Sequence, residues 1–172
     1  MDVMEAILKR RSIRAYLDTP VPAKELERIA TAGLMAPSAS NMQPWTFVLV
    51  TDPAKRQAIG KGLQQFIAKA PLIVVGTVDK QVNKSWNIVD CAIALQNMVL
   101  YCTSVGLGTC WIGAFNENSV RKACHVPDSH EIIALLTVGY ASPSFPQGSF
   151  FRKDMADTAF LDDWNKPLPC KD

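Results

Sequence analysis

Ser85–Ser104 reads SWNIVDCAIALQNMVLYCTS and is apolar nearly all round when drawn as a helix. A helix at a protein surface carries its apolar residues as one stripe, whereas a helix that is apolar on every side is enclosed by other elements. Gly106 and Gly108 follow closely and are typical of a helix end. We therefore predict a central helix that forms the core of the fold or a large subunit interface.

Strands are predicted on either side of this helix, because short runs rich in β-branched residues are bounded there by turn residues. The predicted strands cover residues 46–50, 72–78, 109–112 and 131–140. Further helices are predicted from Asp2, after Pro22, from Asp52 to about Lys69, and over residues 116–124. Strands that alternate with helices indicate a mixed α and β class, with helices on both faces of one sheet.

Length and charge narrow the class of protein. The 172 residues suit one domain, and a net charge of +2 argues against a large nucleic-acid surface. No apolar run approaches the ~18 residues of a membrane span. The N-terminus, MDVMEAILKRR, begins acidic and ends basic, the reverse of a secretory signal. We expect a cytoplasmic protein that binds neither nucleic acid nor membrane.

Cysteine and histidine usage indicates neither a disulfide framework nor a metal site. The five cysteines are odd in number and form no CxxC motif, and neither histidine lies near a cysteine pair with zinc spacing. Cys124 and His125 are adjacent, so on a helix they would point in different directions and make a poor nucleophile pair. We expect packing roles for the cysteines, as for Cys91 and Cys102 in the apolar helix, and no metal.

The densest basic cluster is Arg10–Arg14, RRSIR. If it is helical, Arg10 and Arg14 share a face; if it is extended, Ser12 joins them on that face. Arginine forks match a phosphate group bidentately, and a second basic pair, Arg152–Lys153, lies far along the chain. The alternative is a solvated basic helix end, which the helix dipole favours.

Two further stretches are candidates for ligand contact. Ala36–Trp45, APSASNMQPW, is uncharged but crowded with polar groups, more than a helix-to-strand connection of about four to six residues requires. Cys110–Phe115, CWIGAF, is an apolar strand that stops at Gly113–Ala114, where a backbone can approach a ligand closely. The alternative for this second stretch is a core strand followed by a turn.

Familiar nucleotide and catalytic motifs are absent from the sequence. It has no GxGxxG after a strand, no GxxxxGK[ST] and no GxSxG elbow. A dedicated dinucleotide-binding domain is therefore not expected, whereas a mononucleotide held by arginines remains open. The paired acids Asp162–Asp163 lie on a predicted surface tail. If the protein is an enzyme, its side chains do not reveal the chemistry, and this favours a bound cofactor as the reactive group.

Taken in order along the chain, these features resemble the small members of the FMN-dependent nitroreductase family. The resemblance covers almost the whole chain and rests on Arg10–Arg14, Ala36–Trp45, Asp90 with the helix that leads into Gly106–Gly113, and Arg152–Lys153. It implies an α+β fold with a central mixed, mainly antiparallel sheet. It also implies a homodimer whose subunits exchange terminal segments and share two FMN sites at the interface. Residues 1–172 would form a single FMN-binding domain, with a tail from about 141 to 172 on the partner subunit.

The resemblance implies which residues hold the cofactor. The FMN phosphate would be bound by Arg10, Arg11 and Ser12, with Arg152 or Lys153 closing on it from the tail. Arg14 would lie near the pyrimidine edge of the flavin, where a cation favours the anionic reduced form.

The remaining implied contacts surround the flavin ring. The partner subunit would supply a loop of six contact residues: Pro37, Ser38, Ala39, Ser40, Asn41 and Gln43. Trp111 and Ile112 would pack against the ring, and the backbone N–H of Gly113 would point at flavin N5. The family often carries a glycine where this chain has Ser40.

The implied activity is that of an NAD(P)H-dependent oxidoreductase. NADH or NADPH would pass hydride to flavin N5, and an acceptor such as a nitroaromatic or a quinone would then take its place, in ping-pong order. Two alternatives stay open: a flavin-binding module without turnover, and a relative of the flavin-dependent reductive dehalogenases. Those relatives usually carry a longer lid before the central helix, whereas residues 79–84 are short here.

Overall fold

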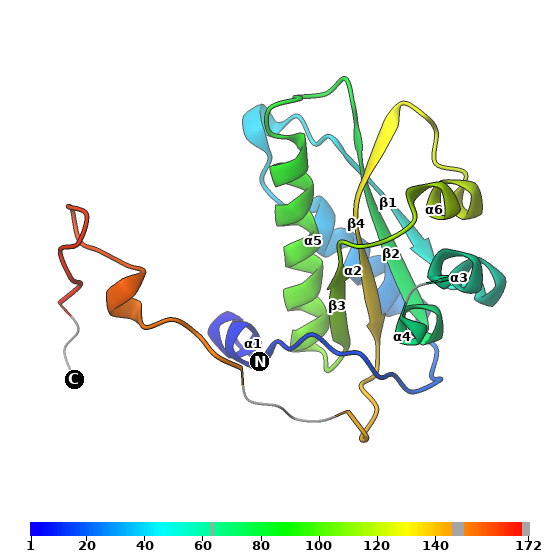
Figure 1. Ribbon diagram of the computed structural model, residues 1–172, viewed down its shortest axis with the longest axis horizontal. Coiled ribbons are helices and arrows are strands. Elements are labelled where there is room, and N and C mark those ends of the chain that lie inside the picture. The colour runs from blue at the N-terminus through cyan, green and yellow to red at the C-terminus, as the bar shows by residue number, and fades with distance from the viewer. Residues whose placement is uncertain (63, 146–149, 170–172) are drawn as a thin grey trace.

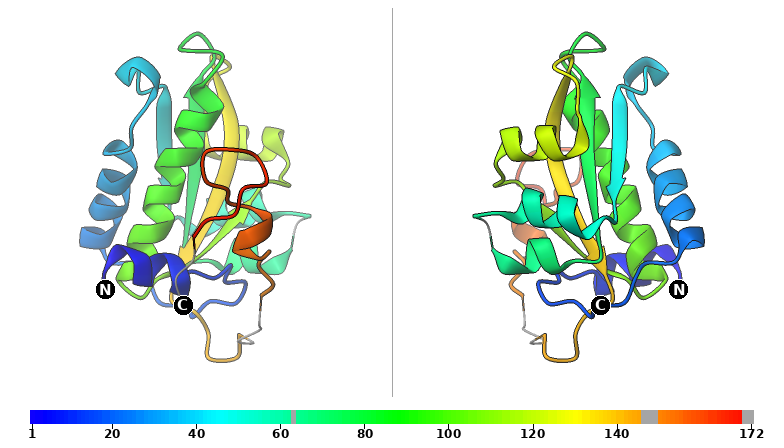
Figure 2. Two further views of the ribbon diagram at one scale, coloured as in Figure 1. Left: turned by 90° about the vertical axis from the view of Figure 1, so that its left-hand side faces the viewer. Right: turned by 90° about the vertical axis from the view of Figure 1, so that its right-hand side faces the viewer.

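A computed structural model describes residues 1–62, 64–145 and 150–169, and its sheet is built round β2 (Leu72–Asp79), which is buried along nearly its whole length. The other strands are β1 (Trp45–Val50), β3 (Gly108–Ile112) and β4 (His130–Gly139). The strand order is β1-β2-β4-β3, and every neighbouring pair is antiparallel. Helices cover both faces of the sheet (Figures 1 and 2), as predicted.

The predicted central helix is α5 (Asn87–Ser104), which packs on one face of the sheet with α2 (Ala23–Leu34) beside it. The helix approaches β2 closely at Gly76, where an added Cβ would lie 2.7 Å from a methyl carbon of Leu95. α5 stops just before Gly106, as predicted, and Gly106 has a left-handed backbone (φ 81°). The Leu107 N–H then donates back to the Cys102 carbonyl over 2.8 Å, the pattern of a glycine C-cap.

The opposite face carries α3 (Pro53–Gly60), α4 (Gln65–Lys69) and α6 (Glu117–Cys124). The prediction of one helix from Asp52 to about Lys69 is therefore wrong. The chain breaks at Gly62, whose φ of 78° cannot continue a right-handed helix. It then folds back so tightly that an added Cβ at Gly60 would lie 2.9 Å from the Ala68 backbone nitrogen.

Polar side chains fix the starts of three helices. Asp2, Asp52 and Asn116 each accept a hydrogen bond from the backbone N–H three residues later, over 2.8, 2.8 and 3.0 Å. The first of these caps begins α1 (Val3–Lys9), as the sequence predicted. Two 3₁₀ helices complete the elements: η1 (Ala39–Asn41) and η2 (Met155–Asp157).

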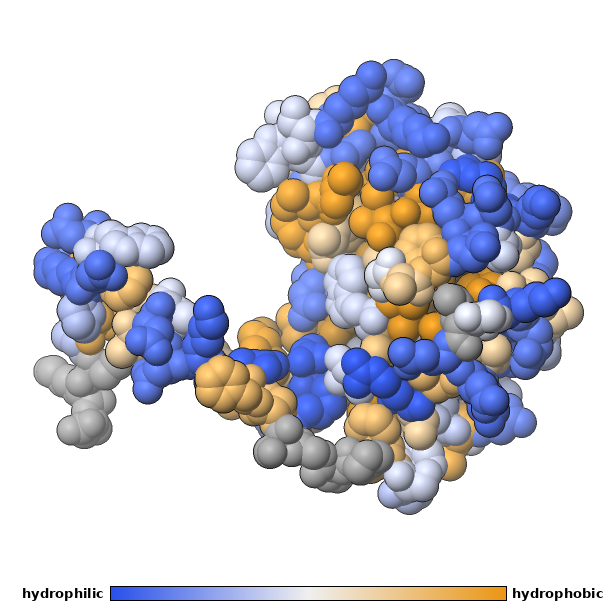
Figure 3. Space-filling model, in the orientation of Figure 1, coloured by the Kyte–Doolittle hydropathy of each residue, from blue (hydrophilic) through white to orange (hydrophobic). Residues whose placement is uncertain are grey.

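The chain beyond residue 150 extends away from the body of the molecule (Figure 1). Phe151 and Trp164, both 84% exposed, lie on this extension. Figure 3 shows apolar side chains gathered over α5, on the side of the body that faces the extension. α1 likewise leaves its apolar stripe in solvent. Within the described ranges, no helix is both long and apolar enough to cross a membrane.

Candidate functional site

The basic stretch after α1 is extended, which decides between the two conformations considered for it. Ser12 forms an isolated parallel bridge with Thr109 at the start of β3, and the Ile13 N–H donates to the Thr109 carbonyl over 2.8 Å. Gly108 permits this approach, because an added Cβ there would lie 2.6 Å from the Ile13 side chain. This bridge is the parallel part of the otherwise antiparallel sheet in the described chain.

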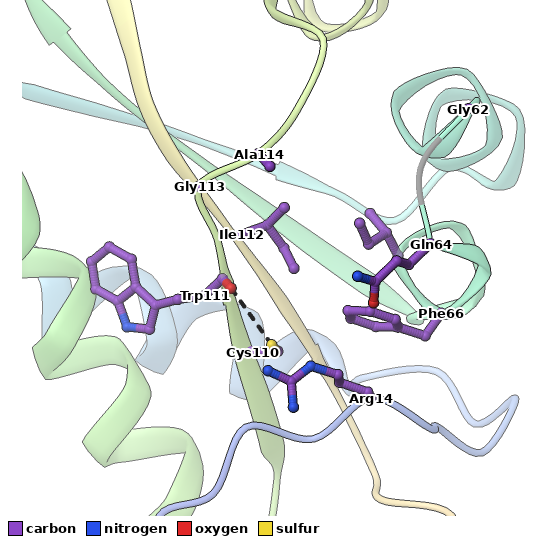
Figure 4. Close-up of a pocket in the computed structure, with 10 residues that line it drawn as sticks. Arg14, Gly62, Gln64, Phe66, Cys110, Trp111, Ile112, Gly113 and Ala114 are labelled. Carbon is purple, nitrogen blue, oxygen red and sulfur yellow. Dashed lines mark hydrogen bonds between the residues drawn. The ribbon is translucent and has the colours of Figure 1, made fainter.

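Arg14 of this stretch lies beside Cys110 of β3 in the structure (Figure 4). Burial raises the pKa of the Cys110 thiol, whereas Arg14, a hydrogen bond from Ser12 and Arg10 all act in the opposite direction. Because the stretch is extended, its two-residue period places alternate side chains on one side. Arg10, Ser12 and Arg14 therefore share a face.

Arg152, in the tail, joins this cluster because it and Arg11 both contact the aromatic ring of Phe150. The guanidinium carbons of Arg11 and Arg152 both lie over the Phe150 ring, 3.8 and 4.4 Å from its centroid. Burial lowers the pKa of Arg10, and the positive charges of Arg152 and Arg11 lower it further. Lys153 is exposed and stands apart from these contacts.

The four arginines of this cluster make no ion pair with a described carboxylate. Like charges held close together repel unless an anion lies between them. Guanidinium groups bind phosphate oxygens in pairs. Arg10, Arg11, Ser12 and Arg152 therefore suit a phosphate monoester such as that of FMN, and Arg14 carries the positive charge into the adjacent pocket.

A pocket of about 540 Å³ continues from Arg14 along the end of β3 (Figure 4). Cys110 and Ile112 face α4 across it, whereas the Trp111 indole points to the other side, towards α5. The β3–β4 ladder stops at Ile112, and an added Cβ at Gly113 would meet no atom within 4 Å. The end of the strand thus presents bare backbone to a pocket, as the glycine indicated.

The sequence did not predict the far wall of this pocket. It comes from the segment where the predicted third helix breaks, and its members are Gly62, Gln64, Phe66 and Ile67. The signal was present in Gly60 and Gly62, because two glycines in an expected helix favour an interruption.

The polar loop has an unusual backbone. Ser40, Asn41 and Gln43 have φ of 52°, 54° and 47°, a left-handed conformation that residues other than glycine adopt at a cost. The Gln43 N–H donates to Ser38 Oγ over 3.0 Å. The left-handed backbone at Ser40 gives a physical reason why a glycine would suit that position.

Within one chain the loop and the cation cluster lie at different sites. Pro37, Ser38 and Ala39 line a separate hollow of about 290 Å³ against α5, which shares no lining residue with the pocket at β3. One chain therefore does not bring together all the residues that the sequence assigned to a single flavin site.

The fold and the site define an α+β protein with a pocket at the end of a sheet strand, lined on one side by Arg14. The chain belongs to the Nitroreductase family, whose model matches residues 7–62 and 58–140. An NADH dehydrogenase of Thermus thermophilus is 30% identical over 185 aligned residues, which cover 85% of this chain and 90% of the relative. The predicted family is thus confirmed.

Two solved structures show the same fold. A nitroreductase with bound FMN from Bacteroides fragilis is 27% identical with a TM-score of 0.79, and the match covers 95% of this chain and 100% of that chain. An FMN-dependent nitroreductase from Clostridium difficile is 29% identical with a TM-score of 0.80, covering 94% and 99% of the two chains. The predicted fold class is therefore confirmed.

Proposed function

We propose that this protein is an FMN-dependent oxidoreductase that takes hydride from NADH or NADPH and delivers it to an electron acceptor such as a nitroaromatic or a quinone, in ping-pong order. The observation that carries the proposal is that Arg14, on the extended stretch that also holds Arg10 and Ser12, lines a pocket that ends at the open backbone of Gly113. Relatives named for NADH and for FMN support the choice of reductant and cofactor.

In this proposal the cation cluster binds the phosphate end of the cofactor. Arg10, Arg11 and Ser12 hold the phosphate, and Arg152 closes on it from the tail because Phe150 already brings it beside Arg11. Lys153 is the weaker candidate, since it lies outside these contacts. Burial of Arg10 strengthens its attraction for an anion, because less water screens the charge.

The pocket orients the rest of the cofactor. Arg14 lies at its mouth and places a positive charge beside the ring, and Ile112 forms an apolar wall. Trp111 contributes its backbone here, since its indole points away. The Gly113 N–H would meet flavin N5, the centre that accepts and gives up hydride when FMN is bound. No carboxylate or histidine lines the described pocket, so we assign proton delivery to solvent.

We further propose a homodimer in which the loop of one subunit completes the site of the other. Pro37, Ser38, Ala39, Ser40, Asn41 and Gln43 would then contact the flavin held by the partner's arginines. The exposed apolar side chains on α1, on α5 and on the extension from residue 150 support such an interface. The chain as a whole would act as one domain, with residues 141–172 reaching the partner; of these, 146–149 and 170–172, including Cys170, lie outside the described residues.

Anaerobic reduction tests the proposal. NADH or NADPH is added without oxygen to protein loaded with FMN, and flavin absorbance is followed before and after an acceptor is supplied. We expect rapid bleaching by the reductant and recovery on addition of the acceptor. Bound FMN that is not bleached would leave a flavin-binding module without turnover, and protein that takes up no FMN would overturn the cofactor assignment.

A further inference from the structure

Asp90 is a buried carboxylate that the proposed function does not use. It lies in the first turn of α5, is 3% exposed, and lines the hollow beneath the polar loop. Its Oδ1 accepts a hydrogen bond from the Ala39 N–H over 3.1 Å. Its Oδ2 is buried and has no hydrogen-bond partner among the described residues.

Burial of this kind carries a cost. A carboxylate oxygen removed from water without a partner destabilises the folded chain. A neutral side chain would remove that cost, so stability alone gives no reason for an aspartate at the start of an apolar helix. The helix N-terminus offsets part of the penalty through its dipole. What the carboxylate does provide is its contact with the loop.

The loop needs an external anchor because its backbone is strained. Three left-handed residues, Ser40, Asn41 and Gln43, follow one another within four positions. Inside the loop the hydrogen bonds are local, and its end is held where the Asp79 N–H donates to the Pro44 carbonyl over 2.9 Å. At the start of η1, the link to the body of the protein is the bond from Ala39 to Asp90.

We propose that Asp90 is a positioning residue that holds the loop in the conformation in which it contacts FMN. This inference rests on the proposed function, in which that FMN is bound mainly by the arginines of the partner subunit. Asp90 touches no cofactor itself. Because its N–H donates to Asp90 and its carbonyl accepts from the Met42 N–H, Ala39 is left to contact a ligand mainly through its methyl group. One buried side chain in each subunit thus controls cofactor affinity in the other.

Substitutions at Asp90 separate the hydrogen bond from the charge. Asp90→Ala removes the acceptor, and we expect FMN affinity to fall at least tenfold in a fluorescence titration. Asp90→Asn keeps an acceptor for Ala39, so its affinity should stay within about threefold of the unsubstituted protein. The matched control is Glu25→Ala. It removes a carboxylate of α2 that accepts a hydrogen bond over 2.5 Å from the hydroxyl of Tyr101, which lies on α5 like Asp90 but away from the loop. It should leave FMN affinity unchanged.

A second variant breaks the same bond from the other side, in case Asp90→Ala does not fold. Ala39→Pro deletes the N–H donor, and the extended backbone of Ser38 (φ −140°, ψ 155°) is compatible with a following proline. It should weaken FMN binding as much as Asp90→Ala, and the two changes together should weaken it no further. Equal affinity in both single variants and the unsubstituted protein would overturn the inference, as would additive losses.

A mixed dimer shows which site Asp90 serves. Arg10→Ala and Asp90→Ala subunits, co-expressed with different tags, should form a heterodimer that binds one FMN with unsubstituted affinity, because one of its two sites contains both intact parts. If Asp90 acted on its own subunit's site, both sites would be impaired and no tight FMN would bind. Failure of the unsubstituted protein to bind FMN would count against the proposed function, whereas normal binding by Asp90→Ala would count only against this inference.

Discussion

Arg10 and Arg14 lie four positions apart in an extended stretch, so their side chains leave the backbone on the same face. A hydrogen bond to a charged group contributes about 1.5–3 kcal/mol, equivalent to roughly tenfold to hundredfold in affinity for each arginine. Arg10→Ala with Arg14→Ala should therefore yield colourless protein that takes up no FMN in a titration. Arg28→Ala, which removes an exposed arginine on α2, is the control. Stoichiometric FMN in the double variant would sink the phosphate assignment.

The left-handed backbone of Ser40, with φ of 52°, destabilises the folded chain. We expect Ser40→Gly to raise the free energy of unfolding by up to about 1 kcal/mol, because glycine adopts this region without strain. Ser40→Val should lower it by a similar amount, since a β-branched side chain fits this region poorly. Urea titrations measure both. Ser119→Gly in α6 is the opposite-sign control, because glycine inside an ordinary helix is destabilising.

Two elements meet the pocket at glycines with different backbones. An added Cβ meets nothing at either Gly62 or Gly113, but only Gly62 has a positive φ. Gly62→Ala should therefore lower the free energy of unfolding by about 1 kcal/mol through backbone strain alone. Gly113→Ala should leave stability within about 0.5 kcal/mol yet weaken FMN binding, because its methyl group enters the space at the strand end. Thermal melts on both variants measure the effect of backbone strain on stability, and FMN titrations measure the obstruction of the cofactor site.

Two buried thiols of α5 should make the free energy of unfolding fall as the pH rises above about 9. Burial raises the pKa of the Cys91 and Cys102 thiols from 9.0 to about 12. In the unfolded chain these thiols ionise near pH 9, whereas the folded chain keeps them protonated to about pH 12. Their contribution is thus complete below pH 9 and is lost as pH rises towards 12, at up to about 1.4 kcal/mol per pH unit for each thiol.

The measurement is the free energy of unfolding as a function of pH. Cys91→Ala should be less stable than the unsubstituted protein at pH 7, because it opens a cavity, but its stability should decline less steeply above pH 9. Val99→Ala opens a similar space on α5 and keeps both thiols, so it should retain the full steepness. If the free energy of unfolding declined equally steeply above pH 9 in both variants, the buried Cys91 thiol would not be a cause of the pH dependence.

Elements with one strong local pattern were predictable from the sequence, and contacts between distant elements were not. The apolar period of α5 and the β-branched runs placed the core, and the two-residue period of an extended RRSIR put Arg10 with Ser12 and Arg14. The break at Gly62 was missed because an apolar pattern on both sides of it still fitted a helix. Phe150 was missed because its contact with Arg11 joins residues almost a whole chain apart, and no local pattern records such a pairing.

At the scale of the whole molecule, the residues proposed to contact FMN lie in two separate places on one chain. The loop lines the hollow against α5, whereas Arg14 lines the pocket at β3, and the apolar residues Val89 and Ile93 of α5 lie partly in solvent beside the loop. Apolar groups grouped in this way favour burial against another surface. In the proposed homodimer, a second copy of the chain covers these groups and brings its arginines to this loop, so cofactor binding and dimerisation should rise and fall together.

Charges introduced on this face test that coupling. Val89→Glu with Ile93→Glu places two carboxylates where an apolar interface would form, and burying unpaired charge is strongly unfavourable. We expect the variant to elute as a monomer in size-exclusion chromatography with light scattering, to keep its far-ultraviolet circular dichroism, and to lose FMN although every arginine remains. Lys122→Glu, an exposed change on α6, should stay dimeric and yellow. A folded monomer with undiminished FMN affinity would show that one chain builds the site alone, because the partner's loop would then be dispensable.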